Sequence, residues 1–364
     1  MTTVDGDSSG LFNSPSAIFS YLGRNLDGLR ADSTTSAFSD CASDRSGEFA
    51  PGSGGRGLLA AACMGDRPDD DETIAQLVSD LESESLETQR SAAMEIRLLA
   101  KNNMENRVRI ADAGGIEPLV ALAQSSELQI QELGVTALLN LSLCDENKER
   151  ILSAGADRAL IRTLRTGTGT AKENAACAIL RLSHKDEIKE RIGRAGAVPP
   201  LVRLLESGSL RGKKDAAVAL FALTTVKENK VRAVEAGVMR PLVDLMAEPE
   251  SGMVDKAALV TLNLATAPEA RASLVEEGGI PVLVEVLEDG NHRQKEFAAG
   301  ILLELCEDST RNRGLVAREG AIPPLVALSQ TGTPRARQKA ETLIRYLRQP
   351  RSGGNGARTT EISD

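Results

Sequence analysis

One ten-residue pattern recurs along the chain at nearly constant spacing, and this repetition limits the possible folds more than any other feature. The segment AGGIEPLVAL, residues 113–122, returns in five related copies. A period of this length indicates stacked supersecondary units, because each unit can bury its apolar face only against its neighbours. The leading glycines are 41 residues apart, once 42, and they are Gly114, Gly155, Gly196, Gly237, Gly278 and Gly320.

Each unit is expected to contain three helices. The short first helix, such as residues 146–154, ends at the repeated glycine, which favours a left-handed helix cap. Proline then lies just inside the second helix, where its missing N–H is harmless, at Pro199, Pro241 and Pro323. The chain therefore turns a sharp corner between these two helices.

The third helix of each unit is expected to be longer and to follow a Ser-Gly loop such as residues 206–209. In the copy at residues 172–183, apolar side chains keep helical spacing. Its predicted inward face consists of Ala175, Ala176, Ile179, Leu180 and Leu182. Small alanines on this face would let neighbouring helices approach closely.

The repeat pattern also predicts the domain organisation. Residues 72–100 supply a second and a third helix without a glycine-marked first helix, so they would form a capping unit before six fuller units. The period lies within the range of about 40–47 residues for armadillo and HEAT repeats. We predict an all-α fold, an armadillo-repeat right-handed superhelical solenoid over residues 67–348. The Ser/Gly/Asp-rich arm 1–66 and the tail 349–364 are predicted to be disordered.

Composition excludes several function classes. Aromatic residues make up 2% of the chain, so the core must be aliphatic, as in closely stacked helices. The formal net charge is −9, and residues 66–87, with nine acids and one base, account for most of it. Without a basic excess to neutralise phosphates, we expect no nucleic-acid partner.

Cysteine usage indicates a protein of a reducing compartment, and hydropathy indicates a protein that is neither secreted nor membrane-spanning. The five cysteines form no CxxC pair and are odd in number, which does not describe a disulfide framework. The amino terminus is polar, and no run of about 18 apolar residues suggests a membrane span. We expect an unsecreted monomer in the cytoplasm, the nucleus or both.

Three motifs resemble catalytic or metal sites but fail on detail. The loop at residues 207–215 resembles a phosphate-binding loop, yet it lacks the correct glycine spacing and follows a helix rather than a strand. The cluster at residues 183–186 suggests a catalytic triad, but adjacent loop residues rarely converge on one substrate atom. His184 and His292 have no cysteine at ligand spacing. We therefore expect no enzyme activity, no catalytic residues, no metal and no cofactor.

The segments RGKKDAAVALFALT, KENAACAILRLS and ENKVRAVEAGVMRPLVDLM closely resemble armadillo repeats of plant U-box proteins, and the resemblance covers about residues 72–348. The Ser-rich segment 39–49 also resembles the linker that precedes the array in that family. The resemblance implies that the array recognises substrates, receptors or regulators, whereas the U-box recruits a ubiquitin-conjugating enzyme. We find no U-box-like segment, so we expect a scaffold or adaptor in ubiquitin-linked signalling without ligase activity.

Stacked third helices would form a concave groove that binds a protein or peptide. Importin-alpha-like arrays clamp basic nuclear localisation peptides with Asn late in the third helix and Trp one turn earlier. Trp is absent here, so import-cargo binding remains an alternative function rather than our main prediction. The candidate groove residues, from the Asn register, are Arg97, Asn140, Arg181, Asn263, Glu304 and Arg345. The arginines would either bind carboxylates or phosphates of a partner or remain solvated beside Glu132 or Glu173.

The amino-terminal arm contains two further candidate sites. Phe19, Leu22, Leu26 and Leu29 fall on one helical face, which is either a residual apolar stretch or a short docking helix. Ser43 and Ser46 stand in a polar segment and are candidate phosphorylation sites.

Overall fold

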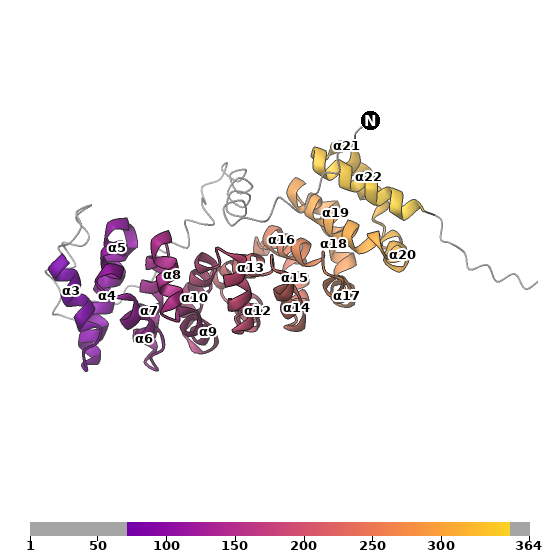
Figure 1. Cartoon of the computed structure of the whole chain (residues 1–364). Helices are drawn as coiled ribbons and strands as arrows, with labels where there is room; N and C mark the ends of the chain where they lie inside the picture. Colours follow the sequence, from indigo (N-terminus) through magenta and orange to yellow (C-terminus); the bar gives the residue numbers. More distant parts are fainter. Residues whose placement is uncertain (1–70, 350–364) are drawn as a thin grey trace, which may run out of the picture. The chain divides into compact units, whose positions relative to one another are not determined.

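The computed structural model describes residues 71–349, and within this range it contains helices and no β-strand (Figure 1). The chain divides into two compact units, one ending at Pro241 and the other beginning at Leu242. We call them the first and the second unit and describe each by itself. The predicted arm and tail, except Gln349, lie outside the described residues, as do Phe19, Leu22, Leu26, Leu29, Ser43 and Ser46.

The predicted cap and six three-helix repeats are present. The cap consists of α3 (Asp71–Asp80) and α4 (Leu86–Asn102). The first helices are α5 (Met104–Asp112), α8 (Asp145–Ser153), α11 (Asp186–Arg194), α14 (Lys227–Glu235), α17 (Pro268–Glu276) and α20 (Thr310–Arg318). The second helices are α6 (Ile116–Ala123), α9 (Ala156–Thr166), α12 (Val198–Ser207), α15 (Met239–Met246), α18 (Gly279–Asp289) and α21 (Ile322–Thr331). The third helices are α7 (Leu128–Leu141), α10 (Gly169–Leu182), α13 (Leu210–Leu223), α16 (Val254–Leu264), α19 (His292–Glu307) and α22 (Pro334–Arg348), and a 3₁₀ turn, η3 (Pro249–Ser251), precedes α16.

The repeated glycine makes the corner between the first and second helices. All six predicted glycines have positive φ, between 76° and 92°, a conformation that side chains with a Cβ rarely adopt. Proline follows within the first turn of α12 and α21, as predicted. The local sequence therefore determines where each second helix starts.

Third helices pack side by side in the first unit, where α4, α7, α10 and α13 follow one another. The predicted inward face of α10 is confirmed, because each of its five apolar residues is at most 4% exposed. The alanines of this face allow the close approach expected of stacked third helices. The expected loop at residues 206–209 is shorter than predicted, because α12 continues through Ser207 and the chain turns only at Gly208 and Ser209.

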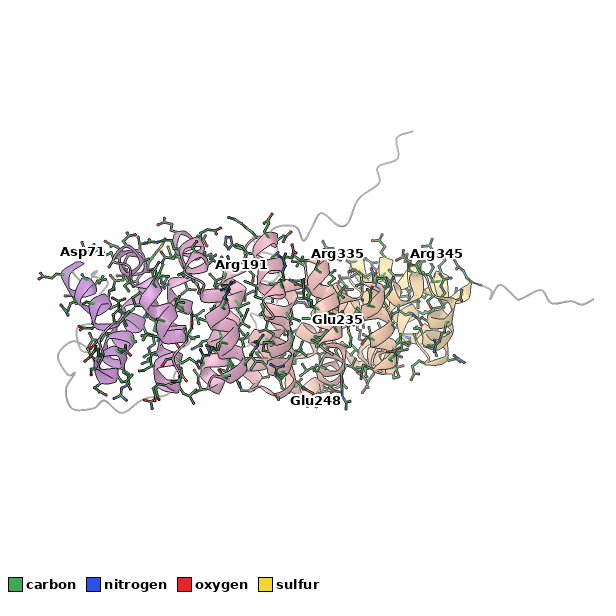
Figure 2. The ribbon with its side chains drawn as sticks, turned by 60° about the horizontal axis from the view of Figure 1, so that its bottom comes forward. Asp71, Arg191, Glu235, Glu248, Arg335 and Arg345 are labelled. Carbon is green, nitrogen blue, oxygen red and sulfur yellow. The ribbon has the colours of Figure 1, made fainter. Side chains whose placement is uncertain are left out.

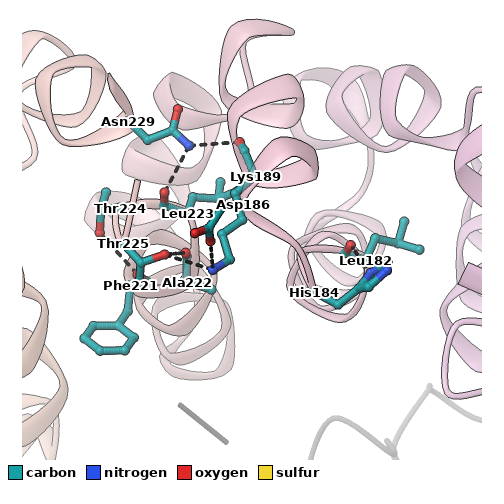
Figure 3. Close-up of polar contacts among 10 residues, drawn as sticks. All are labelled: Leu182, His184, Asp186, Lys189, Phe221, Ala222, Leu223, Thr224, Thr225 and Asn229. Atoms are coloured by element: carbon teal, nitrogen blue, oxygen red, sulfur yellow. Dashed lines mark hydrogen bonds and ion pairs between the residues drawn. The ribbon is translucent and has the colours of Figure 1, made fainter. Parts of the chain in front are cut away.

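Buried polar side chains join successive first helices of the first unit (Figure 3). The Asn229 amide nitrogen on α14 donates to the carbonyl oxygens of Lys189, at 2.9 Å, and Leu223, at 3.0 Å. Asn147 on α8 repeats the pattern with the carbonyls of Arg107, at 3.0 Å, and Leu141, at 3.3 Å. Since both asparagines are fully buried, these bonds give their amide N–H groups partners inside the protein and tie each first helix to the preceding repeat.

The same junction buries a lysine. Lys189 is 2% exposed, and its ammonium donates to Asp186 Oδ1, at 2.7 Å, and to Thr225 Oγ1, at 3.0 Å (Figure 3). Burying a charged head is unfavourable unless it is paired and hydrogen-bonded, and both conditions are met here. The sequence pattern did not indicate this junction.

The second unit repeats the same packing. Its third helices α16, α19 and α22 pack in succession, and α18 packs on α19. Buried residues such as Leu259, Phe297 and Leu343 form its core. The last second helix, α21, buries only Leu325 and Leu328, so the core thins toward its end.

Candidate protein-interaction surface on the third helices

The predicted groove residues share one repeat position but differ in exposure. In the first unit Arg97, Asn140 and Arg181 lie on the adjacent helices α4, α7 and α10. Asn140 is only 8% exposed, whereas both arginines are half-buried. The three positions therefore lie on one row of adjacent helices, but their side chains differ in solvent exposure.

Asn140 is engaged within the protein. Its amide nitrogen donates to the carbonyl oxygen of Arg97 at 2.9 Å, which joins two neighbouring repeats. An import receptor would need this amide to bind a peptide backbone instead. The contact weakens the import-like alternative at this position.

Arg97 is influenced by the charge of the α7 carboxylate that the sequence suggested as its neighbour, Glu132. Partial burial lowers the pKa of the Arg97 guanidinium, and the negative charge of Glu132 opposes this shift. Arginine still remains protonated at physiological pH, because its ordinary pKa is above 12. Arg97 can thus offer a positive charge beside a fixed acid.

A polar network crosses three helices of the first unit. On α10, the Asn174 amide nitrogen donates to Thr136 Oγ1 on α7 at 2.8 Å. On α13, Arg211 Nη2 donates to Asn174 Oδ1 at 2.9 Å, and Arg211 Nε lies 3.6 Å from Glu173 and from Asp215. Thr136 occupies the position where an import receptor has Trp. The network therefore fills part of the surface where a peptide clamp would stand.

Hydroxyl groups at the starts of third helices make a second repeated contact. Each accepts a backbone N–H of its own helix as an N-cap and donates to a glutamate on the preceding third helix. The pairs are Thr168 with Glu132, Ser209 with Glu173, and Thr333 with Glu296. We did not predict this arrangement, although Ser or Thr followed by a helix is a recognisable cap signal.

In the second unit the candidates are partly paired. Glu304 on α19 lies 3.8 Å from Arg271, which also lies 3.8 Å from Asp308. Asn263 on α16 is half-buried and also takes part in an interaction. Arg345 on α22 is exposed (Figure 2), and its Nη2 donates to Thr342 Oγ1 at 3.5 Å. Arg345 is therefore the most accessible of the candidates.

The residues that suggested a catalytic triad are used structurally. Ser183 is buried and donates to the Ile179 carbonyl at 2.6 Å. The His184 ring contacts the Leu182 carbonyl at 2.8 Å (Figure 3) and Glu149 at 3.3 Å. Hydrogen bonding from Lys185 lowers the pKa of the Glu149 carboxyl. No hydroxyl here is poised toward the imidazole, so the cluster lacks the geometry of a nucleophile and its base.

Residues 71–349 lack the features of two other kinds of site. No helix of this range is both long enough and apolar enough to span a bilayer. The same range holds no group of three or more His, Cys, Asp or Glu side chains arranged for a metal ion.

Helix triplets with a glycine corner and stacked third helices define an armadillo-repeat solenoid. The model of the plant U-box protein ARM repeat region matches residues 73–352. The chain therefore belongs to this family, as its sequence resemblance indicated.

Plant U-box proteins match this chain over part of the array. U-box domain-containing protein 4 of Arabidopsis thaliana is 53% identical over 72 residues, which is 20% of this chain and 9% of that protein. The E3 ubiquitin-protein ligase SPL11 of Oryza sativa subsp. japonica is 55% identical over 73 residues, 20% of this chain and 10% of that protein. The chain thus covers about a tenth of the length of these relatives.

Solved structures with the same fold include engineered arrays. One engineered protein has a TM-score of 0.68 at 28% identity, and the match covers 76% of this chain and 68% of that protein. Armadillo repeat proteins designed for modular peptide recognition have a TM-score of 0.59 at 26% identity, covering 64% of this chain and 99% of theirs. These likenesses support the armadillo architecture.

Proposed function

We propose that this protein is a non-catalytic interaction scaffold that binds a protein segment on its third helices. Membership of the plant U-box armadillo family carries this proposal, since the array of such proteins presents repeated helices rather than a reaction centre. The designed armadillo proteins of the same fold are described as made for peptide recognition, which supports a peptide or protein ligand. We place the function in ubiquitin-linked signalling, in the cytoplasm or nucleus, with residues 67–348 as the folded array.

The contact chemistry would come from the half-buried arginines of the first unit. A guanidinium can hold a carboxylate by two parallel hydrogen bonds. Arg97 and Arg181 stand at one register of α4 and α10, one helix apart on either side of α7. In the second unit, exposed Arg345 on the last helix offers a guanidinium of the same kind. Partners with spaced acidic residues fit this arrangement.

The test begins with a partner identified by cross-linking to the full chain and mass spectrometry. We expect the double variant Arg97→Gln/Arg181→Gln to bind that partner about tenfold more weakly, because two charge-assisted contacts are lost. The matched control Arg335→Gln/Arg337→Gln removes two exposed charges from α22 and should leave the affinity unchanged. Equal affinities of all three proteins would reject the third-helix surface as the site.

The non-catalytic assignment has its own test. We expect no ubiquitin transfer when the purified chain is incubated with activating enzyme, conjugating enzyme, ubiquitin and ATP. Ubiquitin chains formed above the background without this protein would overturn the assignment.

Binding of basic localisation peptides is the second candidate function, favoured only by the asparagines at two of the third-helix positions. Titration with such a peptide distinguishes it from the scaffold proposal. Micromolar binding that is lost in Asn140→Ala/Asn263→Ala would support import-like recognition. Because Asn140 already bonds the Arg97 carbonyl, we expect no such binding.

A further inference from the structure

The solvent side of α9 is almost entirely arginine. Apart from Thr166, its exposed residues are Arg158, Arg162 and Arg165, whereas the other α9 residues are buried. At 1.5 Å per residue, these three side chains leave the helix within about 10 Å along its axis. Such spacing on one face concentrates positive charge.

A fourth arginine continues this face onto the next repeat. Helix α12 packs beside α9, and its exposed Arg203 follows Arg162 by one repeat. Neighbouring helices pack about 8–10 Å apart, which sets the distance between these two positions. Arg165 Nη2 also donates to the Gly196 carbonyl, just before α12, at 3.3 Å. We call Arg158, Arg162, Arg165 and Arg203 the arginine face.

These four guanidinium groups lack carboxylate partners within residues 71–349. Three other exposed arginines of the first unit are paired: Arg150 lies 2.7 Å from Asp112, Arg191 lies 2.9 Å from Asp157, and Arg194 pairs with Glu190, whereas exposed Arg240 on α15 has no ion pair within residues 71–349. Asp157, next to Arg158 in the sequence, is thus already occupied by α11. Glu206 is exposed on α12 but makes no ion pair with the arginine face.

We propose that the arginine face binds an acidic segment of a partner protein. Alternate residues of an extended segment lie about 6.6–6.8 Å apart, close to the rise of about 6 Å from Arg158 to Arg162. Glutamates or aspartates at alternate positions can therefore meet successive guanidinium groups in paired hydrogen bonds. The face lies on second helices, so the proposal is independent of the third-helix surface.

A protein segment fits this face better than a nucleic acid. The arginine face covers two helices; the preceding second helix, α6, exposes Glu117, and the following one, α15, exposes Arg240 together with Asp244. With a net charge of −9, the chain has no basic excess to neutralise the phosphates of a long polyanion. A short acidic segment needs only the local charge of the arginine face, because screening limits charge interactions to about 8 Å at physiological salt.

The test uses the full chain and a fluorescein-labelled synthetic peptide with glutamate at alternate positions, measured by fluorescence anisotropy. We expect binding that weakens with added salt and that a peptide with glutamine at those positions does not show. The variant Arg158→Glu/Arg162→Glu/Arg203→Glu should bind at least about tenfold more weakly. Replacing the same residues with lysine should reduce the affinity less. Lysine keeps the positive charge but cannot bind a carboxylate by two parallel hydrogen bonds as a guanidinium does.

The matched control reverses three exposed arginines of α22, Arg335→Glu/Arg337→Glu/Arg348→Glu, and changes the net charge equally. Its affinity should equal that of the unmodified chain, and circular dichroism should show both triple variants folded. Unchanged affinity in the α9/α12 variant, or equal loss in the α22 variant, would overturn the proposal. Tighter binding of single-stranded DNA than of the acidic peptide would also overturn it.

Discussion

Helices α9 and α18 are both second helices, and they lie three repeats apart in the sequence. Yet they present opposite charges to solvent. Where α9 exposes Arg162 and Arg165, α18 exposes Glu285 and Glu288 at the corresponding positions. Their buried residues are alike, with Leu160 and Leu283 both fully buried. Repetition thus maintains the apolar face that the fold needs and leaves the solvent face free to differ.

The largest expected effects concern the buried half of this comparison. Leu160→Ala and Leu283→Ala should each lower the free energy of unfolding by about 2–5 kcal/mol, because each leaves a cavity between packed helices. Urea denaturation followed by circular dichroism measures both. A loss below about 1 kcal/mol at either position would mean that the two leucines do not contribute equally to the hydrophobic core.

A glycine on α11 should show the next largest effect. A Cβ built on Gly193 would lie 1.8 Å from Asn229 Oδ1, so Gly193→Ala must displace the buried asparagine that joins α11 to α14. We expect a loss of about 1–3 kcal/mol by the same denaturation. The control is Gly169→Ala at the start of α10, where a Cβ meets no atom within 4 Å. Equal stabilities of the two variants would contradict the tight junction.

Alkaline pH should destabilise the fold through a buried thiol of the second unit. Burial raises the pKa of Cys306 to about 12, above the ordinary thiol value. Above about pH 8.5 the unfolded thiol ionises while the folded thiol keeps its proton, so the free energy of unfolding falls. The contribution is about 1 kcal/mol by pH 9.5. Cys306→Ala should show a weaker decline of stability over this pH range, and an identical pH profile would disprove the assignment.

The smallest effects on stability are expected at the charged faces themselves. Arg162→Glu and Glu285→Arg should each change the free energy of unfolding by less than about 0.5 kcal/mol, because both side chains are exposed. Their effects on binding should differ. Only Arg162→Glu should weaken capture of the acidic peptide, and a similar loss from Glu285→Arg would erase the functional distinction between α9 and α18.

The sequence by itself determined the repeat architecture. Its period predicted the cap and six units, and the six leading glycines all adopt the left-handed conformation expected of them. The inward residues of α10 were also predictable. These features depend on local backbone preference and on apolar spacing within one helix, and both can be recognised in a single sequence.

Only the tertiary structure decided how polar side chains are used. Asn140 bonds a carbonyl of the preceding repeat, Asn174 links Thr136 to Arg211, and Lys189 is buried beside Thr225. The lack of carboxylate partners for the arginine face among residues 71–349 is likewise a property of the assembled helices. Such contacts join residues about one repeat apart, and a hydrogen bond forms only when packing brings donor and acceptor to about 3 Å. Sequence spacing predicts which helices are neighbours but not which side chains meet between them.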